Sequence, residues 1–154
     1  MATLNVTITE ELTLNGADRG SVNTLSVASV TQVYHRIVTC PAGSDSTIAT
    51  FQTATSTSDN AVDLEDAKYV RVTNLDGSNS VNLSLQVSAD EDGAADASAT
   101  ILLAAGRSYI MGATHDGIAV DDDSAGIVTS LTDLESILID PGSNAVSVEV
   151  YIAS

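Results

Sequence analysis

Residues 69–87 constrain the fold more than any other part of the chain, because apolar and polar residues alternate along them. The second half of this stretch is Val81-Asn82-Leu83-Ser84-Leu85-Gln86-Val87. A period of two places the apolar side chains on one face of a β-strand and the polar ones on the other. The first half alternates through Val70 and Val72, and residues 76–80, Asp-Gly-Ser-Asn-Ser, are typical of a turn. The stretch therefore predicts a β-hairpin with one buried and one solvated face.

Comparable short runs recur along the whole chain, separated by Gly-rich or Asp-rich turns. They cover Leu4–Thr9, Thr47–Thr53, Ala99–Ala104, Tyr109–Met111 and Val146–Ile152, among others. About nine or ten strands at spacings of roughly 10–15 residues, with no convincing long helix, indicate an all-β protein. We expect an antiparallel, jelly-roll-like β-sandwich with little or no helix. Residues 1–154 form one domain in this interpretation, and residues 1–20 are a candidate N-terminal strand or arm.

Three segments leave alternatives open. Residues 25–39 alternate over a long distance with mixed faces, which fits a bent or bulged strand or one that crosses between sheets. Residues 131–138 have helical spacing of leucines, but Ile137-Leu138-Ile139 reads as a buried strand, and we favour a loop or single turn followed by a strand. Residues 56–66 read as a polar loop, with one possible helical turn at 63–67.

The charge is strongly acidic and limits the partners that the chain can bind. The chain has five Lys and Arg residues and 21 Asp and Glu residues, which gives a net charge of −16. Such a chain is a poor binder of nucleic acid phosphates and of anionic membrane surfaces, so neither is expected as a partner. Most of the excess lies late in the chain, since residues 61–154 hold sixteen acids against three cations. Two interpretations fit these acids: they keep the protein soluble, or their electrostatic field steers a basic partner toward the chain.

Candidate chemical groups are few and widely spaced. The chain has two histidines, His35 and His115, and one cysteine, Cys40, so it has no intrachain disulfide. A zinc site needs three or four N, S or O ligands, and a nucleophilic cysteine needs a base and an orienting group. Neither pattern is present. We expect Cys40 to be a small, semi-buried core residue.

Two acidic clusters are conceivable calcium sites. One is Asp90-Glu91-Asp92 with Asp96, and the other is residues 121–123, Asp-Asp-Asp. The first does not fit an EF-hand loop, which needs glycine at position six and glutamate at position twelve, because those positions are Ala95 and Ile101. We therefore assign no metal, cofactor or catalytic residue, and expect the protein not to be an enzyme.

Three stretches have a recognisable form: residues 69–75, Tyr-Val-Arg-Val-Thr-Asn-Leu, residues 103–109, Leu-Ala-Ala-Gly-Arg-Ser-Tyr, and the C-terminal strand 148–154. They resemble stretches of small β-sandwich virion proteins of tailed bacteriophages, in particular capsid decoration (cement) proteins. The resemblance covers about residues 67–154. It implies a non-enzymatic protein that binds the major capsid protein on the outer surface of an assembled head, often as a homotrimer. It also implies synthesis in the host cytoplasm, and the N-terminus has no signal peptide pattern.

Several alternatives remain open at this stage. The protein could instead belong to the neck, tail or fibre of the particle, or be an acidic inhibitor that mimics nucleic acid. A calcium-dependent adhesion module is a further possibility. For the structural roles, Leu4–Thr9 or Val146–Ile152 could pair with a neighbouring subunit by strand addition, because edge strands carry unpaired backbone groups. The polar face of Asn82, Ser84 and Gln86 is a second candidate contact surface.

Overall fold

A computed structural model describes residues 1–52, 61–63, 67–87, 97–112, 114–120 and 126–154. These residues form β-strands and connecting turns, and no helix occurs among them. The prediction of an all-β fold is confirmed. The strands are β1 (Ala2–Glu10), β2 (Thr13–Leu14), β3 (Ala17–Asp18), β4 (Ser21–Val30), β5 (Val33–Cys40), β6 (Ser46–Gln52), β7 (Ala61–Asp63), β8 (Tyr69–Asn74), β9 (Val81–Val87), β10 (Ala97–Leu103), β11 (Ser108–Met111), β12 (Leu134–Asp140) and β13 (Val146–Ala153).

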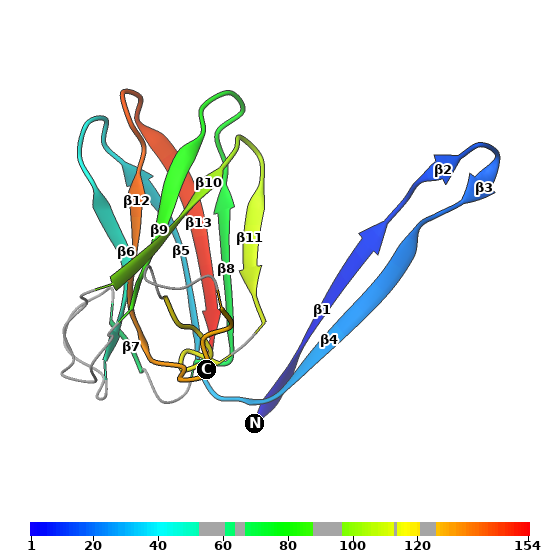
Figure 1. The fold of residues 1–154 in the computed structure, drawn as a ribbon, viewed down its shortest axis with the longest axis horizontal. Coiled ribbons are helices and arrows are strands. Elements are labelled where there is room, and N and C mark those ends of the chain that lie inside the picture. Colours follow the sequence, from blue (N-terminus) through cyan, green and yellow to red (C-terminus); the bar gives the residue numbers. More distant parts are fainter. Residues whose placement is uncertain (53–60, 64–66, 88–96, 113, 121–125) are drawn as a thin grey trace.

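Strands β5 to β13 form a sandwich of two sheets, which we call the body (Figure 1). Sheet I has the strand order β11-β8-β13-β5, and sheet II has the order β10-β9-β12-β6-β7. Most consecutive body strands lie in opposite sheets, and the exceptions are β6–β7 and β9–β10, both in sheet II. This arrangement confirms the predicted jelly-roll-like sandwich. Strand β7 pairs parallel to β6, so it is the exception to the antiparallel pattern.

The core lies between the two sheets and is almost entirely aliphatic. Alternate residues of the facing strands are buried, as the pattern of β9 predicts, and Leu83 and Val148 are fully enclosed. Phe51 is the only phenylalanine and is 1% exposed. Cys40 is buried as a free thiol at the end of β5. Burial raises the pKa of this thiol, which favours its protonated form and a packing role.

The predicted hairpin over residues 69–87 is wrong, although both of its strands exist. Strand β8 belongs to sheet I and pairs with β11 and β13, whereas β9 belongs to sheet II and pairs with β10 and β12. The turn at 75–80 therefore carries the chain across the sandwich rather than back along one sheet. Buried Asn74 organises this crossing: its amide donates to Asn79 O (2.8 Å) and Leu103 O (3.1 Å), and its Oδ1 accepts from Asp76 N (2.9 Å).

The segments that were ambiguous in sequence have definite structures where they are described. The single long strand predicted over residues 25–39 is wrong: β4 ends at Val30 in the arm, and β5 begins at Val33 in sheet I, with Thr31 and Gln32 between them. Residues 134–140 are strand β12, preceded by an isolated bridge between Ile118 and Thr132, as the loop-then-strand interpretation predicts. The predicted loop at 56–66 contains strand β7, and its remaining residues lie outside the described ranges, as does most of the proposed turn at 63–67.

Strands β1 to β4 form a long hairpin, the arm, that projects away from the body (Figure 1). Strands β1 and β4 pair antiparallel from Ala2↔Val30 to Glu10↔Ser21, and β2 and β3 continue the ribbon to its tip. The tip turns at Asn15 and Gly16, whose φ angles of 53° and 77° both lie in the left-handed region. This is the conformation that favours an Asn-Gly pair in a two-residue hairpin turn.

Candidate functional site

Two surfaces stand out as candidates for function: the outer face of sheet I and the arm that meets it. The antiparallel registers define the outer face of sheet I row by row. One row runs Val33–Ala153–Tyr69, the next His35–Tyr151–Arg71–Ile110, and the third Ile37–Glu149–Thr73–Ser108. Apolar, aromatic and charged side chains are thus mixed on this face, next to the base of the arm.

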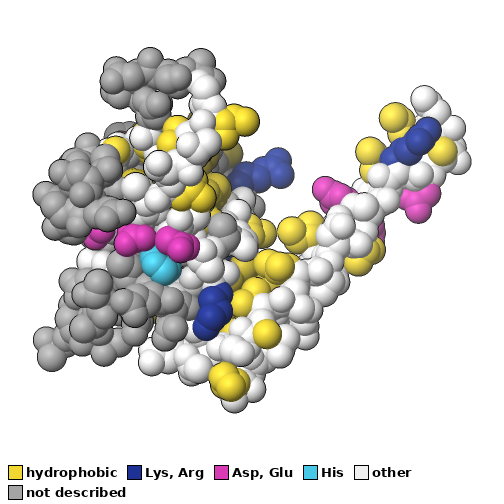
Figure 2. Space-filling model, turned by 60° about the horizontal axis from the view of Figure 1, so that its bottom comes forward, with side chains coloured by type: hydrophobic (Ala, Val, Ile, Leu, Met, Phe, Trp, Pro, Cys, Tyr) yellow, Lys and Arg dark blue, Asp and Glu magenta, His cyan; other side chains and the backbone are white. Residues whose placement is uncertain are grey.

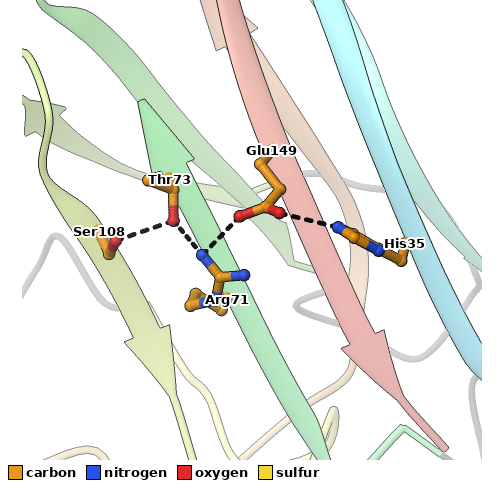
Figure 3. A network of polar contacts seen from close by, with 5 residues as sticks. All are labelled: His35, Arg71, Thr73, Ser108 and Glu149. Carbon is orange, nitrogen blue, oxygen red and sulfur yellow. Dashed lines mark hydrogen bonds and ion pairs between the residues drawn. The ribbon is translucent and has the colours of Figure 1, made fainter. Parts of the chain in front are cut away.

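A polar network crosses all four strands of this face (Figure 3). Glu149 lies at its centre, with one carboxylate oxygen 2.8 Å from His35 Nε2 and the other 2.7 Å from an Arg71 guanidinium nitrogen. Arg71 also donates to the hydroxyl of Thr73, which is 2.8 Å from the hydroxyl of Ser108. The hydrogen bonds from His35 and Arg71 hold the pKa of Glu149 below its usual value, so the carboxylate is charged at neutral pH.

The network contains serine, histidine and glutamate, but not in a catalytic arrangement. Ser108 is on β11 and His35 on β5, at opposite edges of the four-stranded sheet. At ~4.8 Å per strand spacing, their backbones are roughly 14 Å apart, far beyond the hydrogen bond that a nucleophile and its base share. Ser108 bonds to Thr73 instead. The network therefore ties neighbouring strands together and pairs Glu149, the one acid among the described residues of this face, with a cation.

The lowered pKa of Glu149 predicts a specific pH dependence. At a pH above the ordinary glutamate pKa of about 4.3, the pairing stabilises the folded state. This stabilisation is lost as the pH falls through the lowered pKa that Glu149 has in the folded protein. In Glu149→Gln this part of the pH dependence should disappear, with a loss of about 1 kcal/mol or less at pH 7 because the groups are partly solvated. Urea unfolding of both proteins from pH 7 down to pH 3 measures it. Parallel stability curves would contradict it.

The arm is anchored to the body at its base by packing and by backbone hydrogen bonds. Val27 and Val30 are buried with Tyr69 and Ala153, and Leu4, Val6 and Tyr151 pack against this cluster. Thr31 N and Gln32 N both donate to Ser154 O, at 2.7 and 3.1 Å, and Lys68 Nζ donates to Ser29 O at 3.2 Å. The arm base therefore sits on one end of the outer face of sheet I.

Beyond its base, the arm exposes a two-stranded ribbon with distinct faces. Leu4, Val6 and Ile8 lie on the same side as Leu25 and Val27, and we call this side the inner face. The opposite side is mainly polar, with cross-strand pairs Asn5–Ser26 (2.7 Å) and Thr7–Thr24 (3.3 Å). The strands approach closely at Gly20, where a Cβ would lie 2.3 Å from Glu10 O, so glycine permits the pairing there.

The other residues considered from the sequence form no site among the described residues. His35 lies mid-strand and His115 in a loop, as predicted, and they are not brought together. His115 is 3.8 Å from Asp133 and lies between Ala67 and Leu134, to which its backbone is bonded. No group of three potential metal-ligating side chains occurs within the described ranges. Asp90, Glu91, Asp92, Asp96 and residues 121–123 lie outside them.

Other surfaces are less distinctive. On the outer face of sheet II, Asn82 is exposed and bonds to Asp140 (3.3 Å), while Gln86 bonds to Ser84 (2.6 Å). A pocket of about 240 Å³ at one end of the sandwich is lined mainly by apolar residues, including Val87, Val120 and Val128. No helix of the length and apolar character needed to cross a membrane is found in the described part of the chain.

Comparisons with known proteins add little to this geometry. No family model matches the chain, and no curated protein matches its sequence. A solved structure from work on Bacillus endospore appendages, which form a novel family of disulfide-linked pili, is similar at a TM-score of 0.36. It is 14% identical, and the match covers 84% of this chain and 96% of that one. A similarity this low carries no argument about function.

Sequence reasoning identified neither the His35–Glu149–Arg71 network nor the inner face of the arm. The alternating pattern does show that Arg71 and Glu149 point to the same side of their respective strands as Tyr69 and Tyr151. It does not show that β8 and β13 are neighbours, because strand order is not encoded in periodicity. The arm has a clearer signal: the Asn15-Gly16 pair lies between two alternating runs of similar length.

Proposed function

We propose that this protein is a non-enzymatic structural component of a tailed-phage virion, and specifically a decoration protein of the outer head surface. The single observation that carries the proposal is the arm, a long exposed hairpin on a compact jelly-roll body. A two-stranded ribbon is only marginally stable by itself in water, so a ribbon of this length is best explained by a neighbouring subunit that covers it. The resemblance to phage decoration proteins suggests that this neighbouring subunit belongs to a phage head.

The charge supports an exterior position on such a particle. Proteins crowded on a shell stay soluble when their outer surfaces repel one another, and the net charge here is −16. The paired Glu149, Arg71 and His35 leave the outer face of sheet I much less acidic than the chain as a whole. This division suits a protein with one side that makes contacts and another that faces solvent.

Binding to undecorated phage heads tests the proposal. The full-length protein should co-sediment with heads that lack it, and should not bind isolated tails. Val22 is an exposed apolar side chain on the otherwise polar side of the arm. If the shell covers it, Val22→Asp should weaken head binding about tenfold or more, because the variant buries a charge where the apolar side chain made contact. Leu102→Asp is the matched control, since Leu102 lies on sheet II and both side chains are 68% exposed.

The outcomes separate the structural alternatives. Co-sedimentation with tails but not with heads would replace the decoration role by one in the neck, tail or fibre. Binding to neither, with correctly folded protein, would remove the virion proposal altogether. Equal binding of Val22→Asp and wild type would show that the arm is not the contact element.

A further inference from the structure

We infer that the inner face of the arm and the outer face of sheet I form a self-association surface, on which the arm of a second copy of this chain lies. The inference concerns the isolated protein and does not depend on the proposed virion role. It starts from where exposed apolar side chains gather. Of the thirteen large hydrophobic residues that are exposed among the described residues, six lie in the arm and three on the outer face of sheet I.

Ile8 and Leu25 lie on the inner face, the side that packs on the body at the arm base, whereas Val22 pairs with Thr9 on the opposite side. The arm residues include Ile8 (45% exposed) and Leu25 (39%), and the sheet residues are Val33 (51%), Ile37 (64%) and Ile110 (38%). Figure 2 shows the arm diverging from the body with an open angle between them and hydrophobic side chains on both sides of it. Leu25 approaches the body, since a Cβ on Gly112 at the end of β11 would lie 3.4 Å from its side chain.

The chain already shows what this ribbon packs against. At the arm base, Leu4, Val6 and Val27 pack around Tyr69 and Tyr151 on the outer face of sheet I. The exposed residues of the same ribbon face and the same sheet face continue these two surfaces outward. A second arm on the uncovered part of sheet I would therefore extend a contact that the molecule makes with itself.

The dimensions of the two surfaces agree. Strand β1 has nine residues and β13 has eight. At ~3.3 Å per residue they span roughly 30 and 26 Å, so a second arm is long enough to run along the part of the sheet that the arm base leaves uncovered.

Charge favours a second copy as the occupant. Two chains of net charge −16 repel each other, so they can associate only where charge is low. Residues 1–30 hold three acids and one arginine, and the outer face of sheet I holds Glu149 with both Arg71 and His35 as partners. A strongly basic partner needs carboxylates to bind, and both surfaces have few. A second copy of this acidic chain can bind there because the local repulsion is small.

Sedimentation equilibrium of the protein alone tests the inference. At 150 mM salt the wild type should form a closed oligomer, and Ile8→Asp and Ile37→Asp should each weaken association at least tenfold. Leu102→Asp, at a 68% exposed position on sheet II, should not. Because apolar contacts hold repelling chains together, association should tighten as salt screens the repulsion.

Cross-linking separates this contact from other modes of association. A mixture of Ile8→Cys and Ile37→Cys proteins, one of them isotope-labelled, should give mixed disulfide dimers on oxidation, while the native Cys40 stays buried. A protein that remains monomeric at roughly 1 mM, or an oligomer unaffected by both Asp variants, would overturn the inference. None of these measurements uses a phage particle. A failure to bind heads therefore does not affect the self-association result, and a failure to self-associate does not affect the head-binding result.

Discussion

Phe51→Ala is expected to lower the free energy of unfolding by about 3–5 kcal/mol, because it removes an enclosed aromatic ring from a core that cannot close around the space. Phe51 is 1% exposed and lies on β6, between the neighbouring strands β12 and β7. The surrounding core residues are mainly aliphatic, and backbone hydrogen bonds hold the neighbouring strands of sheet II in register. Backbones fixed in this way relax little around a cavity.

Urea unfolding at neutral pH measures the effect, with Leu102→Ala as the control. Leu102 lies on β10 with 68% exposure, and its truncation should change stability by no more than about 0.5 kcal/mol. For a chain of this size the Phe51 variant should also melt roughly 6–20 °C lower. A loss below about 1 kcal/mol for Phe51→Ala would mean that the ring is not packed as described.

Asn74→Asp is expected to cost about 3 kcal/mol or more at pH 7, although the two side chains are nearly the same size. The Asn74 amide donates to Asn79 O and Leu103 O, and a carboxylate would place an unpaired negative charge against both carbonyl oxygens. Asn74 is fully buried, so water cannot replace the lost donors. The crossing between sheets I and II at residues 75–80 depends on these bonds.

The pH dependence of this variant separates the electrostatic effect from simple disruption. A carboxyl group in this position has a raised pKa, so the protonated form is favoured and part of the stability returns as pH falls. The stability difference from wild type should therefore narrow at low pH, while Asn144→Asp in an exposed turn should cost little at any pH. A constant difference from pH 7 to pH 4 would show that the site is disrupted for another reason.

Local pattern predicted much of the body, because burial on one face of a strand imposes a period of two on the sequence. Val81, Leu83, Leu85 and Val87 are all at most 2% exposed, as their spacing indicates. Turn residues also predicted most strand ends, because only certain side chains suit the backbone conformation of a tight turn. Loops with no period, such as the one that contains β7, held no comparable signal.

The candidate site was not predictable in the same way, because its residues come together only through strand order. His35, Arg71 and Glu149 lie on three strands that are adjacent in sheet I but distant in the chain. The alternating pattern of each strand predicts that these side chains lie on its outer face. It does not predict which other strand lies beside it. The same limit explains the error at residues 69–87, since a turn between two alternating strands looks alike whether it closes a hairpin or crosses a sandwich.

Residue type and spacing were enough to predict that this chain forms short strands with one apolar face, separated by turns, and carries a large negative charge. Those properties are local or additive, so they can be read from residue type and spacing. It took the folded chain to show that residues 69–74 and 81–87 belong to opposite sheets, and that the arm extends through β4 to Val30. Both outcomes depend on which surfaces pack together, and that choice is made by the summed burial of the whole chain rather than by any single stretch.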